Sequence, residues 1–281
     1  MVNGSTKVLG LIGNPVAHTF SPAIHNTIAS VMGINSIYEA FKVEESLDKA
    51  VTGAYYLGIE GMNVTVPHKK AVMGSLKEAS DMALKIGAVN TLKRIDGGYK
   101  GFNTDSYGFE RELMENGISV TGRDVIMLGA GGAANAVYHT LVKLGADHIY
   151  LLNRSVEKAR EVFGGFSDVS ILTLGDYKSV PDGKYVCVQC TSVGLGKDSD
   201  KAAIEDEAFY ELIEDGVDLI YNPKETLFMK KVTSHGGRAF NGLDMLLYQA
   251  VKSYEIFMDV IVSDEAVSAA REVLKGIVWE K

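Results

Sequence analysis

Cysteine and proline are scarce in this sequence, and long apolar runs are missing. Only two of the 281 residues are cysteine and five are proline. Two cysteines are too few for the disulfide scaffold of a small secreted protein, so we expect a cytoplasmic protein in a reducing compartment. No run of 18 apolar residues occurs, which argues against a membrane-spanning helix. The low proline content also argues against a proline-rich linker protein.

Positive charge is also in deficit. The chain carries 28 Lys and Arg residues against 36 Asp and Glu residues, a formal net charge of −8 at pH 7. Nonspecific nucleic-acid binding depends on cationic side chains that contact phosphates, so we expect no nucleic-acid partner. A local cationic pocket for a small anion is compatible with this net charge. The sequence leaves open whether the protein is a monomer or a homodimer.

Short apolar runs alternate with helical patterns along the chain. The first part predicts helices at 21–32 and 45–57 and strands at 7–12, 37–43, 63–66, 90–95 and 98–102. Asp96-Gly97, between the last two strands, indicates a hairpin turn. The second part predicts helices at 107–116, 131–143 and 156–163 and strands at 125–128, 149–153, 171–174, 185–189 and 217–221. Two more helices are expected at 243–260 and 264–274.

This alternation is typical of βαβ units with a parallel sheet, so the expected fold class is α/β. At roughly 150 residues per domain, the length suits about two domains. The two terminal amphipathic helices must bury their apolar stripes, and we expect them to return to the first domain. The predicted domains are residues 1–105 plus 242–281, and residues 106–241.

A glycine-rich turn follows the strand predicted at 125–128. Gly129, Gly131 and Ala134 form a G-x-G-x-x-A pattern between a strand and a helix, which is the context of a dinucleotide-binding site. The expected cofactor-binding residues in this turn are Gly129, Ala130, Gly131, Gly132 and Ala133. The alternative is a glycine turn that serves packing alone.

The next strand ends in a polar and cationic segment. NAD-binding proteins usually carry Asp or Glu there to bind the ribose 2′-hydroxyl, but this chain has Asn153, followed by Arg154, Ser155 and Lys158. A guanidinium would bind a 2′-phosphate that a carboxylate would repel. The segment therefore favours NADP over NAD. The alternative is that Arg154 is a solvated residue at a helix start.

Cys187 and Cys190 form a C-x-x-C pattern, which can indicate a redox or metal site. No second cysteine pair is present to complete a zinc site, and the histidines show no metal-binding spacing. We therefore interpret the segment as a buried strand and expect no metal site.

Polar clusters follow several strands of the first part, around Lys69, Asn90 and Asp105. Because open α/β sheets bind ligands at the carboxyl ends of their strands, these clusters are candidates for a substrate site. Without further evidence, Lys69 is more simply interpreted as an exposed lysine at a helix start, which is the usual place of lysine. Asp105 alone is equally an N-cap of the helix predicted from Tyr107. His68 points to the opposite side of an extended backbone from Lys69, which favours a structural role.

The sequence resembles the shikimate dehydrogenase family over nearly its whole length. The matching motifs are Ser21-Pro22, N-V-T-x-P-x-K ending at Lys69, G-A-x-N-T at 87–91, G-x-N-T-D ending at Asp105, G-A-G-G-A at 129–133, N-R-S at 153–155, T-S-x-G-L at 191–195, Y-N-P at 221–223 and G-x-x-M-L-x-x-Q-A at 242–250. The resemblance implies NADP-dependent interconversion of 3-dehydroshikimate and shikimate in aromatic amino-acid biosynthesis. It also implies a substrate-binding domain completed by the C-terminal helices, a Rossmann-like NADP domain, and an active site in the cleft between them.

The resemblance also implies roles for individual residues. Lys69 and Asp105 would be the catalytic pair, and an ammonium group near a ketone oxygen suits that reduction chemically. The other implied residues are Thr19 and Ser21 for the substrate carboxylate, Thr65, Asn90, Asp105 and Gln249 for the ring hydroxyls, Tyr221 near the carboxylate and nicotinamide, and Gly242 in the cofactor site. Without the family, Thr65, Asn90 and Gln249 are equally residues that cap a backbone or satisfy a buried neighbour.

Two positions depart from the family pattern. Thr19 stands where the family often has serine, and the extra methyl alters the volume of the carboxylate pocket. Gln189-Cys190-Thr191-Ser192 replaces the usual N-A-T-S run beside the cofactor. The alternatives to a shikimate dehydrogenase are a quinate/shikimate dehydrogenase with relaxed substrate or cofactor choice, and a non-catalytic sensor that binds NADP and a shikimate-like ligand.

Overall fold

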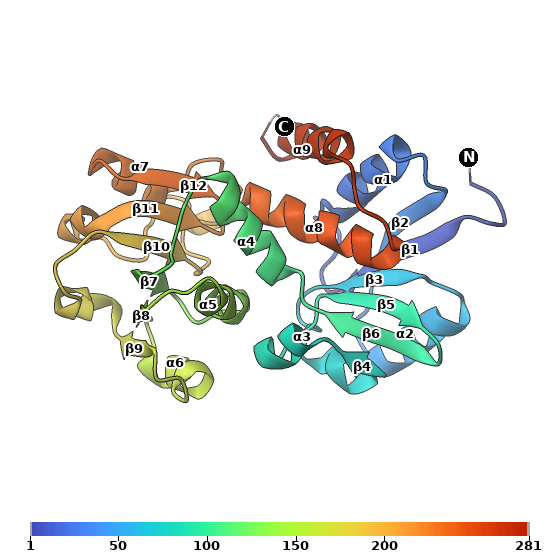
Figure 1. Ribbon diagram of the computed structural model, residues 1–281, viewed down its shortest axis with the longest axis horizontal. Helices are drawn as coiled ribbons and strands as arrows, with labels where there is room; N and C mark the ends of the chain where they lie inside the picture. The colour runs from blue at the N-terminus through green and yellow to red at the C-terminus, as the bar shows by residue number, and fades with distance from the viewer. Residues whose placement is uncertain (1, 280–281) are drawn as a thin grey trace. The chain divides into compact units, whose positions relative to one another are not determined.

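The computed structural model describes residues 2–279 and divides the chain into two compact units (Figure 1). The first unit contains the chain up to Gly108 and the part from Leu246 onward. The second unit is Phe109–Met245. Each unit is built on its own six-stranded sheet, as the α/β prediction requires.

The sheet of the first unit is mixed, with strand order β2-β1-β3-β5-β6-β4. The strands are β1 (Lys7–Gly13), β2 (Ser36–Lys42), β3 (Gly61–Val64), β4 (Glu78–Ala79), β5 (Thr91–Ile95) and β6 (Gly98–Phe102). β1 is parallel to β2 and β3, whereas β5 is antiparallel to β3 and β6. The predicted hairpin is confirmed, and Gly97 at its tip has a φ of +74°. The hairpin pairs Thr91 with Phe102 and so brings the segments beside them together.

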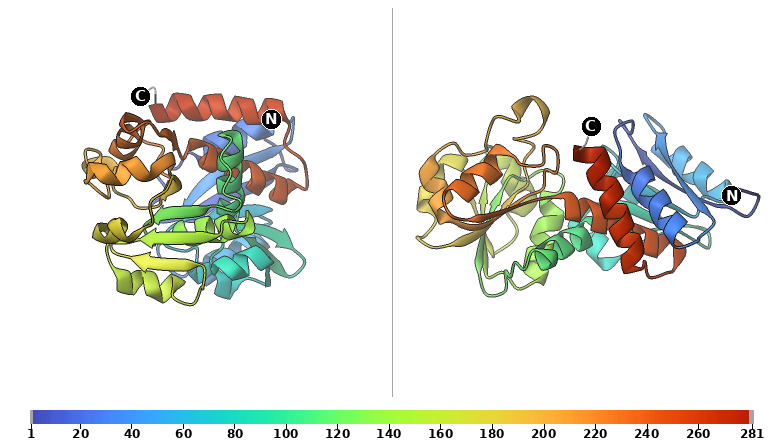
Figure 2. Two further views of the ribbon diagram at one scale, coloured as in Figure 1. Left: turned by 60° about the vertical axis from the view of Figure 1, so that its left-hand side comes forward. Right: turned by 90° about the horizontal axis from the view of Figure 1, so that it is seen from above.

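Helices from both ends of the chain complete the first unit. They are α1 (Ser21–Val31), α2 (Leu47–Tyr56), α3 (Asp81–Ile86), most of α8 (Leu243–Met258), α9 (Asp264–Trp279) and the 3₁₀ helix η1 (Ala71–Ser75). Pro22 lies at the start of α1, where its missing N–H removes no helical hydrogen bond. α9 lies along α1, and Figure 2 shows the two helices side by side. The predicted return of the C-terminal helices to the first domain is confirmed.

The sheet of the second unit is wholly parallel, with strand order β12-β11-β10-β7-β8-β9. The strands are β7 (Asp124–Leu128), β8 (His148–Leu152), β9 (Val169–Leu172), β10 (Tyr185–Gln189), β11 (Ile213–Asp218) and β12 (Arg238–Asn241). When β7 to β12 are numbered 1 to 6, the strand order is 3-2-1-4-5-6, which is the doubly wound order of a Rossmann fold. The carboxyl ends of all six strands therefore lie at one edge of the sheet.

Apolar side chains cover both faces of this second sheet. On β7, Val125 and Met127 belong to one core cluster, and Ile126 and Leu128 belong to the other. The helices are α4 (Asp105–Glu115), which begins in the first unit, α5 (Ala134–Lys143), α6 (Val156–Phe163) and α7 (Leu227–Ser234), with short 3₁₀ helices at Leu174–Ser179, Gly196–Asp198 and Glu207–Leu212. Within residues 2–279, no helix is both long enough and apolar enough to cross a membrane.

Several predicted boundaries are wrong for physical reasons. The helix predicted from Gly131 begins at Ala134, because residues 131–133 form a turn in which the Ala134 N–H donates to the Gly131 carbonyl at 3.1 Å. The strand predicted at 217–221 is β11, which begins four residues earlier and ends three residues earlier. The acidic residues Glu214 and Asp215 hid its first half, and both pair with arginines that are distant in sequence. β4, α3, α7 and β12 were not predicted from the sequence.

Candidate active site and cofactor pocket

Lys69 lies in the turn that follows β3. Its carbonyl accepts a hydrogen bond from the Val89 N–H at 2.8 Å, which fixes the backbone beside the hairpin. Its Nζ donates to Asp105 Oδ2 at 2.6 Å. The Lys69 side chain is 28% exposed and that of Asp105 is 12% exposed, so the ion pair is sheltered but open to a ligand.

Asp105 is the first residue of α4, not the N-cap of a helix beginning at Tyr107 as predicted. Its N–H donates to Asn103 Oδ1 at 3.1 Å, and its Oδ1 accepts from Asn90 Nδ2 at 2.9 Å. Asn90 is held in turn by the Thr104 N–H, which donates to Asn90 Oδ1 at 2.8 Å. The first turn of a helix favours a negative charge, so this position stabilises the carboxylate that faces Lys69.

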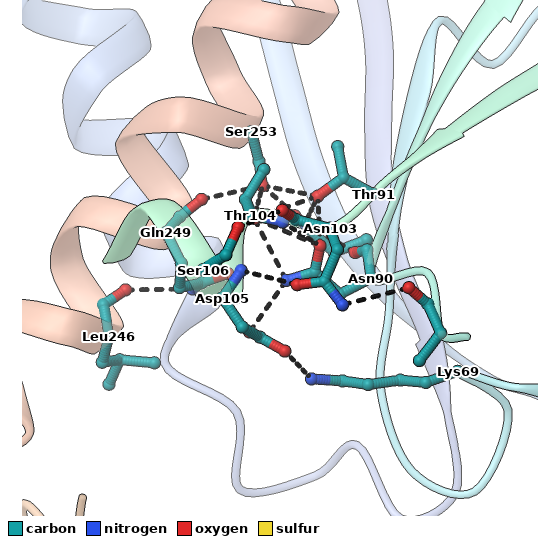
Figure 3. Close-up of polar contacts among 12 residues, drawn as sticks. Lys69, Asn90, Thr91, Asn103, Thr104, Asp105, Ser106, Leu246, Gln249 and Ser253 are labelled. Atoms are coloured by element: carbon teal, nitrogen blue, oxygen red, sulfur yellow. Dashed lines mark hydrogen bonds and ion pairs between the residues drawn. The ribbon is translucent and has the colours of Figure 1, made fainter. Parts of the chain in front are cut away.

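A buried polar network supports Asn90 from behind (Figure 3). The Ser253 hydroxyl on α8 lies 2.8 Å from Thr91 Oγ1 and 3.0 Å from Thr104 Oγ1, and it donates to the Gln249 carbonyl at 2.9 Å. Asn63 Nδ2 donates to Ser253 Oγ at 2.8 Å. Ser253 was not among the residues predicted from the sequence. The available signal was its spacing of four residues from Gln249, which places both on one face of a helix.

The other candidates for substrate binding in the first unit lie near the same strand ends. Thr19 Oγ1 donates to Ser21 Oγ at 3.1 Å, and Ser21 begins α1. Thr65 directly follows β3, and its methyl lies so close to β1 that a β-carbon on Gly13 would be 2.3 Å away. Gln249 Nε2 donates to the Leu246 carbonyl of its own helix at 2.9 Å.

His68 is anchored away from the lysine. Its Nε2 lies 2.7 Å from the Val43 carbonyl, and the residue is buried. This hydrogen bond supports the structural interpretation of His68.

The second unit contains a pocket of about 770 Å³ at the carboxyl ends of its strands. Gly129 on its floor has a φ of +95°, and a β-carbon there would lie 2.6 Å from the Thr191 methyl. Only glycine fits this backbone and this approach. The predicted residues that line the pocket are Gly129, Ala130, Gly131, Gly132, Asn153, Arg154, Ser155 and Lys158.

The cationic side of this pocket follows β8. Asn153 Nδ2 donates to the Ser155 carbonyl at 2.6 Å, and the Ser155 hydroxyl caps α6 by accepting from the Lys158 N–H at 3.3 Å. Arg154 and Lys158 are exposed, and within residues 2–279 no carboxylate forms an ion pair with either. Two available cations beside a glycine turn and a helix N-terminus fit a phosphorylated dinucleotide.

Three predicted residues do not line this pocket: Ala133, Tyr221 and Gly242. Tyr221 follows β11 in the second unit, where burial raises the pKa of its hydroxyl and keeps it protonated. Gly242 is buried, and a β-carbon there would lie 2.5 Å from the Leu219 carbonyl oxygen. The approach of Gly242 to this backbone is a packing reason for glycine, and its cofactor role stays a prediction.

Several residues line the pocket without having been predicted as cofactor-binding residues, although the sequence placed the run from Cys190 to Ser192 beside the cofactor. They are Leu174, Cys190, Thr191, Ser192, Val193, Lys201, Ala202, Ala203 and Glu205. For residues 190–193, the available signal was their position directly after β10, at a strand end beside the glycine turn. Cys187 and Cys190 are free, and burial raises the pKa of both thiols. In the described part of the chain, no three His, Cys, Asp or Glu side chains are grouped to hold a metal.

The parallel sheet, its glycine turn and its cationic pocket, joined to a unit with a lysine–carboxylate pair, define a two-domain dehydrogenase that uses a nicotinamide dinucleotide. Residues 11–92 match the shikimate dehydrogenase substrate binding domain, and residues 112–195 match the shikimate / quinate 5-dehydrogenase family. The chain therefore belongs to the shikimate dehydrogenase family.

Individual relatives agree with this assignment. The chain is 41% identical to a shikimate dehydrogenase (NADP(+)) of Carboxydothermus hydrogenoformans, over 90% of this chain and 92% of the relative. A solved chorismate mutase/shikimate 5-dehydrogenase fusion protein from Clostridium acetobutylicum is similar with a TM-score of 0.90 and 38% identity, covering 97% of this chain and 98% of the other. A shikimate dehydrogenase solved in complex with NADP+ has a TM-score of 0.90 and 35% identity, covering 99% and 98%.

Proposed function

We propose that this enzyme interconverts 3-dehydroshikimate and shikimate with NADP(H), and that Lys69 and Asp105 transfer the proton. The observation that carries the proposal is the 2.6 Å contact between Lys69 Nζ and Asp105 Oδ2, in a partly sheltered position. The reaction belongs to aromatic amino-acid biosynthesis, as it does for the family. We place the enzyme in the cytoplasm as a monomer or a homodimer.

Reduction of a ketone places negative charge on its oxygen, and an ammonium group beside that oxygen stabilises the charge and supplies the proton. A positioned proton donor contributes about 10²- to 10⁴-fold to the rate. Lys69 Nζ is the donor in this proposal, and the Asp105 carboxylate orients it. In the reverse direction the lysine takes the proton from the substrate hydroxyl. When NADPH is bound, it supplies the hydride.

The remaining substrate contacts follow from hydrogen-bonding chemistry. The ring hydroxyls fit donors and acceptors such as Thr65, Asn90 and Gln249. The carboxylate fits the hydroxyls of Thr19 and Ser21, whose mutual hydrogen bond of 3.1 Å already brings them together at the start of α1.

The chain's own residues also explain a preference for NADP. The glycine turn before α5 gives the pyrophosphate backbone N–H groups and a helix N-terminus. Arg154 and Lys158 line the same pocket and would hold the 2′-phosphate, with the guanidinium suited to bidentate contacts. Asn153 replaces the carboxylate that would repel this phosphate.

Replacing Lys69 tests the catalytic assignment. Lys69→Ala removes the proton donor and leaves the substrate hydroxyl contacts in place, so kcat should fall about 10²- to 10⁴-fold while KM for shikimate changes modestly. NADPH absorbance, followed with shikimate and NADP+ supplied, measures both. Lys70→Ala is the matched control, because Lys70 is an exposed neighbour on the same turn. Unchanged turnover in Lys69→Ala would remove the assigned role.

The same assay separates the alternatives. Binding of NADPH and shikimate without turnover in the unsubstituted protein would favour the sensor. The extra methyl of Thr19 makes quinate the comparison substrate, since one methylene changes discrimination by about 1–3 kcal/mol. Equal kcat/KM for quinate and shikimate would identify a quinate/shikimate dehydrogenase instead.

A further inference from the structure

Gln189 ends β10 with its side chain wholly buried. A buried primary amide has two N–H donors and one carbonyl acceptor that need partners. Here the partners are backbone groups of the segment that directly follows the strand. That segment, residues 190–193, is the β10 loop, and all four of its residues line the dinucleotide pocket.

The Gln189 amide is hydrogen-bonded to Thr191 and to Val193 of the β10 loop. The Thr191 N–H donates to Gln189 Oε1 at 2.6 Å, and Gln189 Nε2 donates to the Val193 carbonyl at 3.0 Å. Reversing the amide would set a donor against the N–H and an acceptor against the carbonyl, so the loop fixes its orientation. One side chain thus holds the loop at two points.

The loop conformation set by Gln189 reaches the floor of the pocket through Thr191. The Thr191 hydroxyl accepts from the Val193 N–H at 3.1 Å, and the Thr191 methyl fills the space over Gly129. A shift of Thr191 would therefore change both the wall and the floor against which a dinucleotide lies.

Asp218, at the end of the neighbouring strand β11, closes the network. Its Oδ1 accepts from the Ile220 N–H at 3.0 Å and lies 3.5 Å from Gln189 Nε2. Its Oδ2 accepts from the Thr226 hydroxyl at 2.6 Å. The Leu219 N–H also donates to the Gln189 carbonyl at 3.1 Å. These contacts leave the Gln189 amide little freedom to turn away from the loop.

We propose that Gln189 is a positioning residue for NADP(H), acting through the β10 loop without touching the dinucleotide. The inference rests on the proposed NADP function. It also explains the departure from the family's usual asparagine at this place. An asparagine side chain can accept from the N–H two residues on, but it is one methylene too short to hold the Val193 carbonyl as well.

The test measures NADPH binding by fluorescence titration in the absence of substrate. Gln189→Leu keeps the side-chain volume and leaves the Thr191 N–H and the Val193 carbonyl without partners, so the Kd for NADPH should rise about tenfold. Gln189→Asn keeps the Thr191 bond, and its Kd should rise about threefold. Equal Kd values for all three proteins would overturn the proposal.

A matched control separates positioning from general destabilisation. Val186→Ala cuts a wholly buried side chain on the same strand without touching the loop, so it should lower Tm and keep the Kd for NADPH within about twofold. A tenfold loss of NADPH affinity in Val186→Ala would overturn the proposal.

Hydrogen exchange of the protein without cofactor provides a second readout. Gln189→Leu should speed hydrogen exchange of the Thr191 amide at least tenfold. In Val186→Ala, the Thr191 amide should still exchange slowly compared with the other amides of β10. Failure of the unsubstituted protein to bind NADPH would count against the proposed function, whereas unchanged exchange at Thr191 would overturn the positioning role.

Discussion

At the scale of single residues, the two arginines Arg154 and Arg238 differ in whether a carboxylate pairs with them. Arg154 is exposed at the pocket, and no carboxylate in residues 2–279 pairs with it. Arg238, in contrast, donates to the buried Asp215 at 2.7 Å and belongs to the structure of the sheet. An unpaired guanidinium at a pocket is available for an anion, which makes Arg154 the residue that most directly tests cofactor choice.

Arg154→Ala should weaken NADP+ binding about 10- to 100-fold and leave NAD+ binding nearly unchanged. The expected size is that of one or two charge-assisted hydrogen bonds to the 2′-phosphate, which NAD+ lacks. KM values for both cofactors, measured at saturating shikimate, check this. Arg160→Ala is the control, because Arg160 is an exposed arginine of the helix α6 that follows Arg154, and it lies outside the pocket lining. Equal losses for the two cofactors would contradict a contact with the 2′-phosphate.

Asp218 makes stability depend on pH. Burial raises the pKa of its carboxyl to about 6 from an ordinary 3.8, although the Thr226 hydroxyl and the Ile220 N–H partly oppose this. The folded protein therefore holds this proton more tightly than the unfolded chain. Its contribution favours folding at low pH and is lost as pH rises through the window between these two pKa values.

Asp218→Asn removes this titration, so the unsubstituted protein and the variant should diverge with pH. The free energy of unfolding of the unsubstituted protein, relative to the variant, should fall by about 2–3 kcal/mol between pH 4 and pH 7. Urea unfolding of both proteins at several pH values measures it. A difference that stays constant across this range would show that the pKa of Asp218 is the same in the folded and unfolded protein.

At the scale of elements, helix α8 connects the C-terminal part of the chain to the candidate substrate site. Gln249 and Ser253 lie on the face of α8 that meets the base of the β5–β6 hairpin, where Asn90 and Thr104 face each other. The network thus links a helix and a hairpin that are far apart in sequence, and it holds the carboxylate beside Lys69.

Ser253→Ala should cost about 1–3 kcal/mol of stability, because buried hydroxyls lose a partner. It should also lower kcat/KM for shikimate, since Asn90 and Asp105 lose support from behind. Urea unfolding and steady-state kinetics check the two effects. Thr140→Ala is the control, because this buried threonine of α5 donates to the Ala136 carbonyl at 2.8 Å, within its own helix in the other unit. Equal losses of kcat/KM in both variants would reduce the role of Ser253 to general stability.

The accuracy of the predicted elements depended on where their hydrogen-bond partners lie. The β5–β6 hairpin was predicted correctly because its turn residues are local. β11 was misplaced because Glu214 and Asp215 look like loop residues, and their partners Arg123 and Arg238 lie 91 and 23 residues away in the chain. Only the folded chain shows that these carboxylates are satisfied.

At the scale of the whole molecule, the α/β class and the Rossmann-like sheet followed from the alternation of elements and from one glycine pattern. The supporting network behind Asn90 did not. Asn63 and Ser253 are 190 residues apart, and nothing local in either segment indicates their contact at 2.8 Å. The roles of Lys69 and Asp105 came from the family resemblance, because spacing in the chain does not give a distance.

The division into two units also separates the candidate residues by ligand. Those for substrate binding lie in the first unit, except Tyr221, and those for the dinucleotide lie in the second. Each group is assembled on its own sheet, at strand ends. A substitution that disturbs the sheet of the first unit should therefore first affect the affinity for the substrate, and one that disturbs the sheet of the second unit should first affect the affinity for the dinucleotide.

The floor of the dinucleotide pocket restricts how its sequence can drift. Gly129 is constrained twice, by a torsion that side chains rarely adopt and by the Thr191 methyl above it. Loss of that methyl through Thr191→Ser would relieve the crowding and keep the hydroxyl, but it would leave the torsion unchanged. The two positions therefore differ in what evolution allows. Serine can replace threonine at position 191, but no substitution at position 191 can compensate for a side chain at position 129.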